Sequence, residues 1–456
     1  MVGSAVEPNL EEEIRKVQKT IDLLNVLLDV GPTNVVFYGP SRHLVARSPR
    51  GNFIAKSYKD PSRYETEQRN LETFDRINQT RSPVFQEVSG LSQDYLGLPK
   101  PTNLLDMGGL EPNEQNGARI RIFTPAQGDL LYDKTLQARA TFEDYVGAAV
   151  QIARIQQEGT FLKRRLNLRD VVEQKEYDAP DTAYFQNRFK GLFLGQLSGY
   201  GHVPLSERLV HDMMLDWEVL VAQNLVRMQK IGYAAFYFDG NPTNHVITPD
   251  GRIVSFDLED SIMAPLALGV ASLVSFGMTK GMQPYLSEKD EARILDRFLL
   301  EREFARALKE DARDKARRIV QYTLEMSSAY DANLSGQNGD EFFRFLGDGD
   351  KGHGIEYREG FLEAWPYAML DRNAAWIGHK ARFRSLAERL AGQVKFTTDD
   401  PVRQNAIEQR SHMDRIIQIL GIIKEAPIRN GRYANDAADR LQDRFLELAS
   451  NPYFSP

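Results

Sequence analysis

The sequence predicts an α+β protein, in which a small antiparallel sheet near the N-terminus is followed by a mostly helical remainder. Short β-rich runs at 34–39, 43–48 and 52–58 are separated by glycine and proline turns, a pattern typical of an antiparallel meander. After residue 123, apolar residues recur mainly at helical spacing. One hairpin pattern, at 245–256, interrupts these helices with two apolar runs around a Pro-Asp-Gly turn.

The other elements follow from the same periodicities. A helix is expected at 9–29, capped by Asn9, and another at 63–77, with strands at 102–108 and 118–123 completing the sheet. Further helices are expected at 290–333, 356–393 and 402–425, and 264–278 is expected to contain a buried helix. These elements divide the chain into four parts: an N-terminal helical extension at 1–32, a sheet-containing part at 33–123, a core carrying the acidic motifs at 124–284 and a helical C-terminal region at 285–456.

Composition narrows the classes of function. Hydrophobic residues make up 42% of the 456 residues and the formal net charge is -7, so we expect a globular protein that does not bind nucleic acid. The absence of cysteine excludes disulfides, thiolate metal sites and cysteine nucleophiles. No run of about 18 apolar residues occurs, and the N-terminus lacks the pattern of a signal peptide. We therefore expect a cytoplasmic protein without a membrane partner.

Polar side chains flank both strands of the hairpin at one end. Asp239 and Asn244 precede the first strand, while Asp257 and Glu259 follow the second. The start of one strand of a hairpin lies beside the end of its partner, so these groups can converge. A cluster of carboxylates and a carboxamide suits Mg²⁺, whose common use is to bridge nucleotide phosphates. The simpler alternative is a surface hairpin with solvated acids.

This segment resembles the catalytic segment of the aminoglycoside phosphotransferase and choline kinase group, within the protein-kinase-like fold. That group shows H-G-D-x4-N, a hairpin and then a metal-binding aspartate; the chain has Y-F-D-G-N-P-T-N and then S-F-D-L-E. The resemblance implies a bilobal fold, with Asp239 as the catalytic aspartate and Asn244 and Asp257 as metal ligands. The D-x-E order is similar to that of methylthioribose kinases and makes Glu259 a second acidic ligand. Tyr237 stands where the group has histidine.

The same resemblance implies a nucleotide-binding role for the N-terminal part, with ATP and Mg²⁺ as cofactors. Lys56 lies on an apolar strand and therefore needs an anionic partner. Glu67 on the following helix is the expected partner, and Glu65 is its competitor. A simple ion pair without function is the alternative. Ser41 and Arg42, in the turn at 39–43, would hold phosphate oxygens.

Two further segments extend the resemblance. Backbone groups from Phe123 to Ala126 correspond to the hinge that meets adenine. The run APLALGVASL is similar to the D-P-x-x-D-L-A helix of the group, but Ala264 and Leu268 replace both aspartates. The second of these aspartates normally braces the catalytic loop, so its loss leaves the support of the loop to be explained.

The phosphate acceptor is expected to be the hydroxyl of a small molecule such as a sugar, an amino alcohol or an aminoglycoside-like compound. Alternatives are a protein kinase-like enzyme and a catalytically weak nucleotide-binding module that acts on a protein partner. One candidate acceptor face in the C-terminal region carries Arg372, Trp376, His379 and Lys380 at helical spacing. We expect this face to be the solvated side of an amphipathic helix rather than a binding surface.

Overall fold

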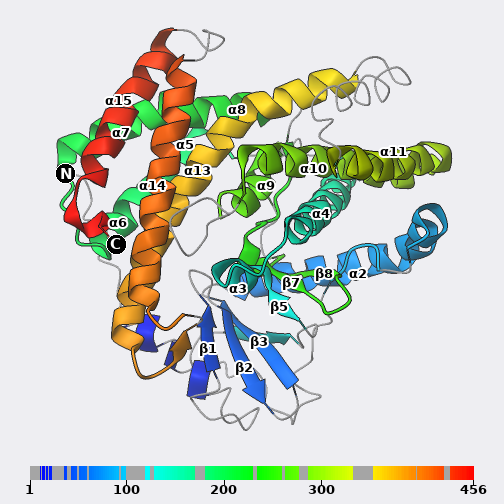
Figure 1. Cartoon of the computed structure of the whole chain (residues 1–456), viewed down its shortest axis with the longest axis horizontal. Coiled ribbons are helices and arrows are strands. Elements are labelled where there is room, and N and C mark those ends of the chain that lie inside the picture. The colour runs from blue at the N-terminus through cyan, green and yellow to red at the C-terminus, as the bar shows by residue number, and fades with distance from the viewer. Residues whose placement is uncertain are drawn as a thin grey trace.

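A computed structural model describes most of the chain, and its elements are labelled in Figure 1. It describes residues between 11 and 22 in part, and then 35–38, 43–48, 51–58, 61–91, 94–98, 119–123, 128–169, 180–229, 234–258, 262–276, 286–331, 353–396, 398–425 and 432–455. The described residues form an α+β structure, in which small sheets are outnumbered by helices. The predicted fold class is confirmed at this level.

The largest sheet contains the predicted meander. Strands β1 (Val35–Tyr38), β2 (His43–Ser48) and β3 (Gly51–Tyr58) are antiparallel neighbours, and β4 (Arg119–Phe123) pairs with β3 so that Lys56 lies opposite Arg121. These strands confirm the predictions at 34–39, 43–48, 52–58 and 118–123. The strand expected at 102–108 lies outside the described residues.

A fifth strand of this sheet comes from the far end of the chain. Strand β10 (Lys395–Phe396) pairs in parallel with β1, with Val36 opposite Lys395 and Phe37 opposite Phe396. The strand order is β10-β1-β2-β3-β4, so β10 lies at the edge opposite to β4. Sequence periodicity did not predict this strand, because it has only two residues between two long helices. The four-part division of the chain stays a prediction, and β10 is a segment of 285–456 that joins the sheet of 33–123.

Helix α2 (Pro61–Ser89) follows β3 and is longer than the helix predicted at 63–77. Leu71 and Phe74 are buried as expected, and Phe85 and Val88 extend the same buried face by further turns. The prediction ended early because the polar run from Asn78 to Ser82 conceals this continuation.

The helical part is built around long helices that lie side by side (Figure 1). Helix α13 packs along α14, which packs along α15, while α10 packs along α4. The helices of this part are α3 (Leu131–Leu136), α4 (Phe142–Arg169), α5 (Thr182–Arg188), η4 (Phe189–Gly195), α6 (Gln196–Gly199), α7 (Glu207–Trp217), η5 (Glu218–Ala222), α8 (Gln223–Met228), η7 (Pro242–Asn244), α9 (Ala267–Val274), α10 (Glu288–Lys309), α11 (Arg313–Asp331), α13 (His353–Leu390), α14 (Pro401–Glu425), α15 (Arg432–Ala449) and η8 (Pro452–Phe454). They include the helices predicted at 290–333, 356–393 and 402–425. None of the helices in the described part of the chain is long and apolar enough to cross a membrane.

The predicted hairpin is present. Strands β7 (His245–Ile247) and β8 (Ile253–Ser255) pair with His245 opposite Ser255, and β5 (Asp129–Leu130) pairs with β7 on its other side. The turn closes through a hydrogen bond from the Gly251 N–H to the Thr248 carbonyl (2.9 Å). Gly251 has a φ of +79°, which glycine adopts without steric cost.

A second small sheet fixes the segment before the hairpin. Strand β6 (Ala234–Phe236) pairs with β9 (Met263–Pro265), which leads into the fully buried helix α9. The predicted buried helix is thus confirmed, although its first residues form a strand. The described residues between 11 and 22 are helical, in agreement with the helix predicted at 9–29. Glu13 attaches this helix to α13 through an ion pair with Arg382 at 2.7 Å.

Candidate active site

A buried lysine joins the large sheet, α2 and the segment after the hairpin. The Lys56 Nζ atom lies 3.3 Å from both carboxylate oxygens of Glu67, and it also forms an ion pair with the Asp257 carboxylate. Lys56 is 4% exposed and Glu67 is fully buried, whereas Glu65 is exposed. Glu67 is therefore the partner of Lys56, as the sequence suggested. A charge buried this deeply is stable only when it is paired, so these contacts fix all three residues.

Asn244 connects Asp257 to the loop that carries Asp239. Its Nδ2 atom donates to the Asp239 carbonyl at 2.9 Å and lies 3.4 Å from Asp257 Oδ2. Asn244 is 1% exposed, at the end of the short helix η7. The Asn241 side chain begins this helix by accepting a hydrogen bond from the Thr243 N–H (3.1 Å). The residues that precede the first strand of the hairpin and the residue that follows its second strand therefore lie together, as their positions in the sequence predicted.

The backbone of Asp257 is unusual. Its φ is +78°, in the left-handed region, which costs a residue with a side chain about 1–2 kcal/mol. Both neighbours are held: the Phe256 N–H donates to the Asn244 carbonyl (3.1 Å), and the Leu258 N–H donates to Glu67 Oε1 (2.9 Å). Asp257 is thus held in a strained conformation with its carboxylate directed at Lys56.

The Asp239 carboxylate has an unused acceptor. Its Oδ1 atom is buried and has no hydrogen-bond partner among the described residues. A buried acceptor without a partner costs free energy, and a substrate hydroxyl that donates to it would remove this cost. The Asp239 Oδ1 atom is therefore suited to accept a hydrogen bond from a bound hydroxyl group.

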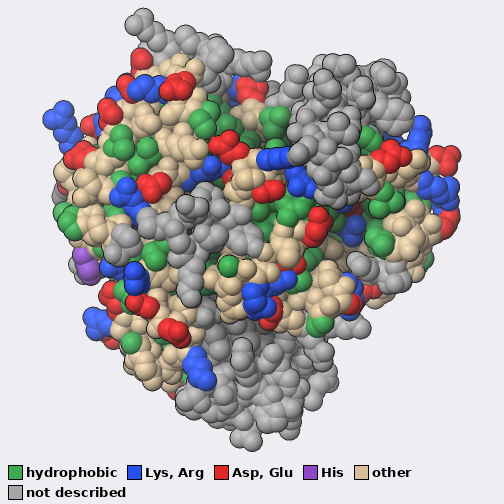
Figure 2. Space-filling view, in the orientation of Figure 1, with side chains coloured by type: hydrophobic (Ala, Val, Ile, Leu, Met, Phe, Trp, Pro, Cys, Tyr) green, Lys and Arg blue, Asp and Glu red, His purple; other side chains and the backbone are tan. Residues whose placement is uncertain are grey.

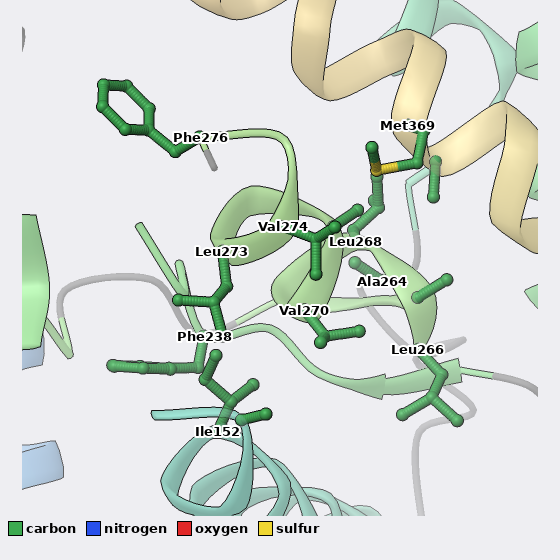
Figure 3. Packing of buried hydrophobic residues seen from close by; sticks show 14 of the residues in the cluster. Ile152, Phe238, Ala264, Leu266, Leu268, Val270, Leu273, Val274, Phe276 and Met369 are labelled. Atoms are coloured by element: carbon green, nitrogen blue, oxygen red, sulfur yellow. The ribbon is translucent and has the colours of Figure 1, made fainter. Parts of the chain in front are cut away.

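The loop around Asp239 is braced by backbone packing. A Cβ atom added to Gly240 would lie 2.4 Å from the Gly269 carbonyl oxygen, and one added to Gly269 would lie 2.7 Å from that of Phe238. The loop and α9 therefore approach each other as closely as two backbones can. Figure 3 shows Leu268 of α9 among apolar side chains, with Met369 of α13 nearby. Leucine fits this apolar site, because it can be buried without the cost of removing a charge from water.

His245 supports the loop from its other end. The ring is fully buried, its Nδ1 atom lies 2.8 Å from the Ser255 hydroxyl, and its edge packs against the Phe238 ring. Burial lowers the pKa of His245 to about 3, although the Gly240 backbone opposes this shift. The imidazole is therefore neutral at physiological pH and acts as a structural spacer.

Tyr237 occupies the place of the histidine in the related motif and points toward α13. Its N–H donates to the Ile262 carbonyl (2.9 Å), and the Arg372 guanidinium lies 5.0 Å from its ring centre. Arg372 and Arg188 share the Asp371 carboxylate, with N–O distances of 3.8 and 3.2 Å. The residue that departs from the motif is thus anchored to the C-terminal helices.

The donor set fits a hard divalent cation. Asn244 and Asp257 lie side by side, and their types of side chain supply the amide and carboxylate oxygens that Mg²⁺ prefers. Asn244 turns its Nδ2 atom toward Asp257, and its Oδ1 atom lies 3.5 Å from the Thr243 hydroxyl. No group of three or more His, Cys, Asp or Glu side chains suited to a metal occurs within the described ranges. Glu259, the third predicted ligand, lies outside those ranges.

Other predicted nucleotide-binding residues are only partly described. Ser41, Arg42 and Ala126 lie outside the described residues. The backbone of Phe123 ends β4, directly opposite Ile54 and two residues from the position that faces Lys56. The roles of these residues stay predictions.

The expected solvated face of α13 was a wrong prediction. Arg372, Trp376 and Lys380 are 6%, 4% and 0% exposed, because α14 covers this face. Lys380 forms a buried ion pair with Glu408 of α14 and donates to the Tyr132 hydroxyl (3.2 Å). Charged residues at these positions signal buried pairing, which the spacing along a single helix does not reveal.

Comparisons with known proteins were made by sequence and by structure. No family model matches the chain, and no curated protein matches it by sequence. Among solved structures, an aminoglycoside phosphotransferase from Alicyclobacillus acidocaldarius is similar at 14% identity and a TM-score of 0.29, covering 86% of this chain and 92% of its own. An ethanolamine kinase from Plasmodium vivax is similar at 10% identity and a TM-score of 0.38, covering 83% and 81%.

A third similar structure is the AMP-bound complex of a spectinomycin phosphotransferase, at 14% identity and a TM-score of 0.24, covering 67% of this chain and 93% of its own. The chain resembles the aminoglycoside phosphotransferase and choline kinase group in its motifs, and phosphotransferases of this kind are also among the solved structures to which it is similar.

Proposed function

We propose that this protein is a phosphotransferase of bilobal, protein-kinase-like fold, which moves the γ-phosphoryl group of ATP to a hydroxyl of a small molecule. The observation that carries the proposal is the convergence of Lys56, Glu67 and Asp257 from three separate elements. A buried lysine that bridges two carboxylates serves phosphate binding well, because a nucleotide phosphate can replace one of its partners. A purely structural ion pair does not require a third charged group in a strained conformation.

Each residue then has a role that its surroundings support. Asp239 would orient the acceptor hydroxyl and accept its proton, since its Oδ1 atom lacks a partner in the described chain. Lys56 would hold phosphate oxygens, with Glu67 keeping its ammonium group in place. Asn244, Asp257 and Glu259 would hold Mg²⁺, which when bound neutralises phosphate charge. Ser41 and Arg42 would cover the phosphates, and backbone groups from Phe123 to Ala126 would meet the adenine.

The position of Asp257 links these roles. Its carboxylate pairs with Lys56, and Asn244 contacts its other oxygen. Positioning of this kind supplies most of the rate in phosphoryl transfer, because the reaction needs aligned oxygens and neutralised charge. The acceptor would be a sugar, an amino alcohol or an aminoglycoside-like compound.

The test measures nucleotide binding and phosphate transfer separately. Calorimetry with ATP, with and without Mg²⁺, is followed by a coupled assay of ADP release over a panel of sugars, amino alcohols and aminoglycosides. Asp239→Asn should retain nucleotide binding and reduce transfer by about 10²–10⁴-fold. Asp257→Asn should abolish the magnesium dependence of binding.

Asp250→Asn is the matched control, because Asp250 lies in the hairpin turn, where Arg252 pairs with it in solvent. It should behave as wild type. Lack of nucleotide binding by the wild-type protein would disprove the proposal. Full transfer by Asp239→Asn would disprove the role of that residue. Binding without transfer to any acceptor would favour a binding module.

A further inference from the structure

We propose that Asn70 is a positioning residue, which together with Glu67 holds Leu258 and thereby fixes the direction of the Asp257 carboxylate. This inference rests on the proposed function, since it assigns Asn70 to the orientation of the metal-binding aspartate. Asn70 itself would touch neither nucleotide nor acceptor.

Two side chains of α2 hold both backbone polar groups of Leu258. The Leu258 N–H donates to Glu67 Oε1 at 2.9 Å, and the Asn70 Nδ2 atom donates to the Leu258 carbonyl at 2.7 Å. Glu67 and Asn70 are three residues apart, so they project from the same face of the helix. The Leu258 side chain is 1% exposed, which fixes the residue at a third point. We call this set of contacts the Leu258 clamp.

The clamp acts on Asp257 because the two residues share a peptide unit. With a φ of +78°, Asp257 would move toward the more common negative φ if its neighbours released it. On its other side the Phe256 N–H is fixed to the Asn244 carbonyl (3.1 Å). Loss of the Asn70 contact leaves Leu258 held by Glu67 and by its buried side chain. The Leu258 side is then loosened, and the carboxylate can turn partly away from Lys56 and Asn244.

The clamp also makes the position of α2 and the direction of Asp257 depend on each other. Glu67 contacts both Lys56 and Leu258, while Asn70 donates to the Leu258 carbonyl. A shift of α2 would therefore break contacts to the lysine and to the metal segment together. Substitution of Asn70 separates the two effects, because it leaves the Lys56–Glu67 pair in place.

The matched control is another asparagine of the same helix. The Asn78 side chain accepts a hydrogen bond from the Leu96 N–H (2.8 Å), so it also holds a distant backbone group. Gly97, the next residue, accepts from the Ser255 N–H (3.0 Å), so exchange at Ser255 is left out of the comparison. Both asparagines are partly exposed. Asn70→Ala and Asn78→Ala therefore remove similar contacts, and only the first touches the clamp. Asn70→Asp is a second test variant, because it keeps the size and directs a carboxylate at the Leu258 carbonyl.

The experiment combines hydrogen exchange with a magnesium titration of ATP binding on the full chain. Asn70→Ala should speed amide exchange in peptides that cover 253–258 and raise the Mg²⁺ midpoint about two- to tenfold, which is the range expected for one hydrogen bond. Asn70→Asp should have at least this effect. Asn78→Ala should leave the Mg²⁺ midpoint and the exchange of the 256–258 amides unchanged, whatever its effect on the unfolding temperature and on Ser255, which donates to Gly97.

Three results would each overturn the inference about Asn70. If Asn70→Ala and Asn78→Ala lower the unfolding temperature alike and leave the Mg²⁺ midpoint unchanged, Asn70 is structural and the inference is wrong. If the wild-type protein binds no nucleotide at any Mg²⁺ concentration, the proposed function fails and the inference fails with it. A shifted midpoint with unchanged exchange at 253–258 would also overturn the clamp, since the effect would then act elsewhere.

Discussion

Replacing Lys380 by methionine should destabilise the protein by about 3–5 kcal/mol, because it leaves the Glu408 carboxylate buried without its cation. Lys380 and Glu408 are 0% and 1% exposed, so water cannot replace the lost partner. Burial lowers the pKa of Lys380, and the Glu408 carboxylate raises it back toward the charged form. The remaining partners of Glu408, Gln404 at 2.9 Å and Tyr132 at 3.4 Å, are neutral donors and cannot balance the charge.

The double variant Lys380→Met with Glu408→Gln should recover most of the loss, because it removes both charges and keeps the shape of the pair. The free energy of unfolding in urea, measured for the wild type, both single variants and the double variant, gives the coupling between the two residues. Lys424→Met is the control: its partner Asp439 is 48% exposed, and the change should cost far less than Lys380→Met, because water screens an exposed pair.

The reasoning would be refuted if Lys380→Met cost no more than Lys424→Met. It would also be refuted if the double variant were less stable than both single variants. Either result would mean that the charges contribute by something other than their mutual neutralisation in the core.

Two further predictions concern the buried histidines and the loop that carries Asp239. Burial lowers the pKa of both His245 and His412 to about 3, so the unfolded chain binds more protons between pH 6.5 and 3 and stability falls as the pH falls through this range. Each histidine should contribute a loss of about 2 kcal/mol between pH 7 and pH 5, and His412→Gln should reduce the difference between urea unfolding at these two pH values; an unchanged difference would contradict this. Gly269→Ala should reduce phosphoryl transfer while ATP binding persists, because its Cβ would lie 2.7 Å from the Phe238 carbonyl and displace the Asp239 loop, at a cost of about 1–3 kcal/mol. Gly191→Ala, which would meet no atom within 4 Å, is the control, and equal effects of the two changes on transfer would refute the role of the close approach.

Features that depend on neighbours in the chain were predictable from the sequence. The strands β1 to β4 and the hairpin alternate or form short apolar runs, and their turns carry glycine and proline. The Lys56–Glu67 pair could be predicted because a lysine on an apolar strand must find a carboxylate. Asn70, three residues after Glu67, was not predicted, because its partner is a backbone carbonyl, which no side-chain pattern identifies.

Features that depend on distant partners were not predictable. The buried face of α13 carries Arg372 and Lys380, and charged residues at helical spacing indicate a solvated face when their partners are unknown. Their carboxylate partners are Asp371 beside Arg372 and Glu408 on another helix. The support of the Asp239 loop was not predictable for a similar reason. Gly240 and Gly269 contribute by having no side chain, which allows two distant backbone segments to approach closely.

Strand β10 has a consequence for how the protein is made. Val36 and Lys395 pair although they are roughly 360 residues apart, a contact of very high sequence separation that forms slowly. During synthesis the edge of β1 stays open until almost the whole chain has left the ribosome, and an open edge strand is a template for aggregation. A nascent or truncated chain that ends before β10 would therefore depend on chaperones, because the strand that completes the first sheet follows α13.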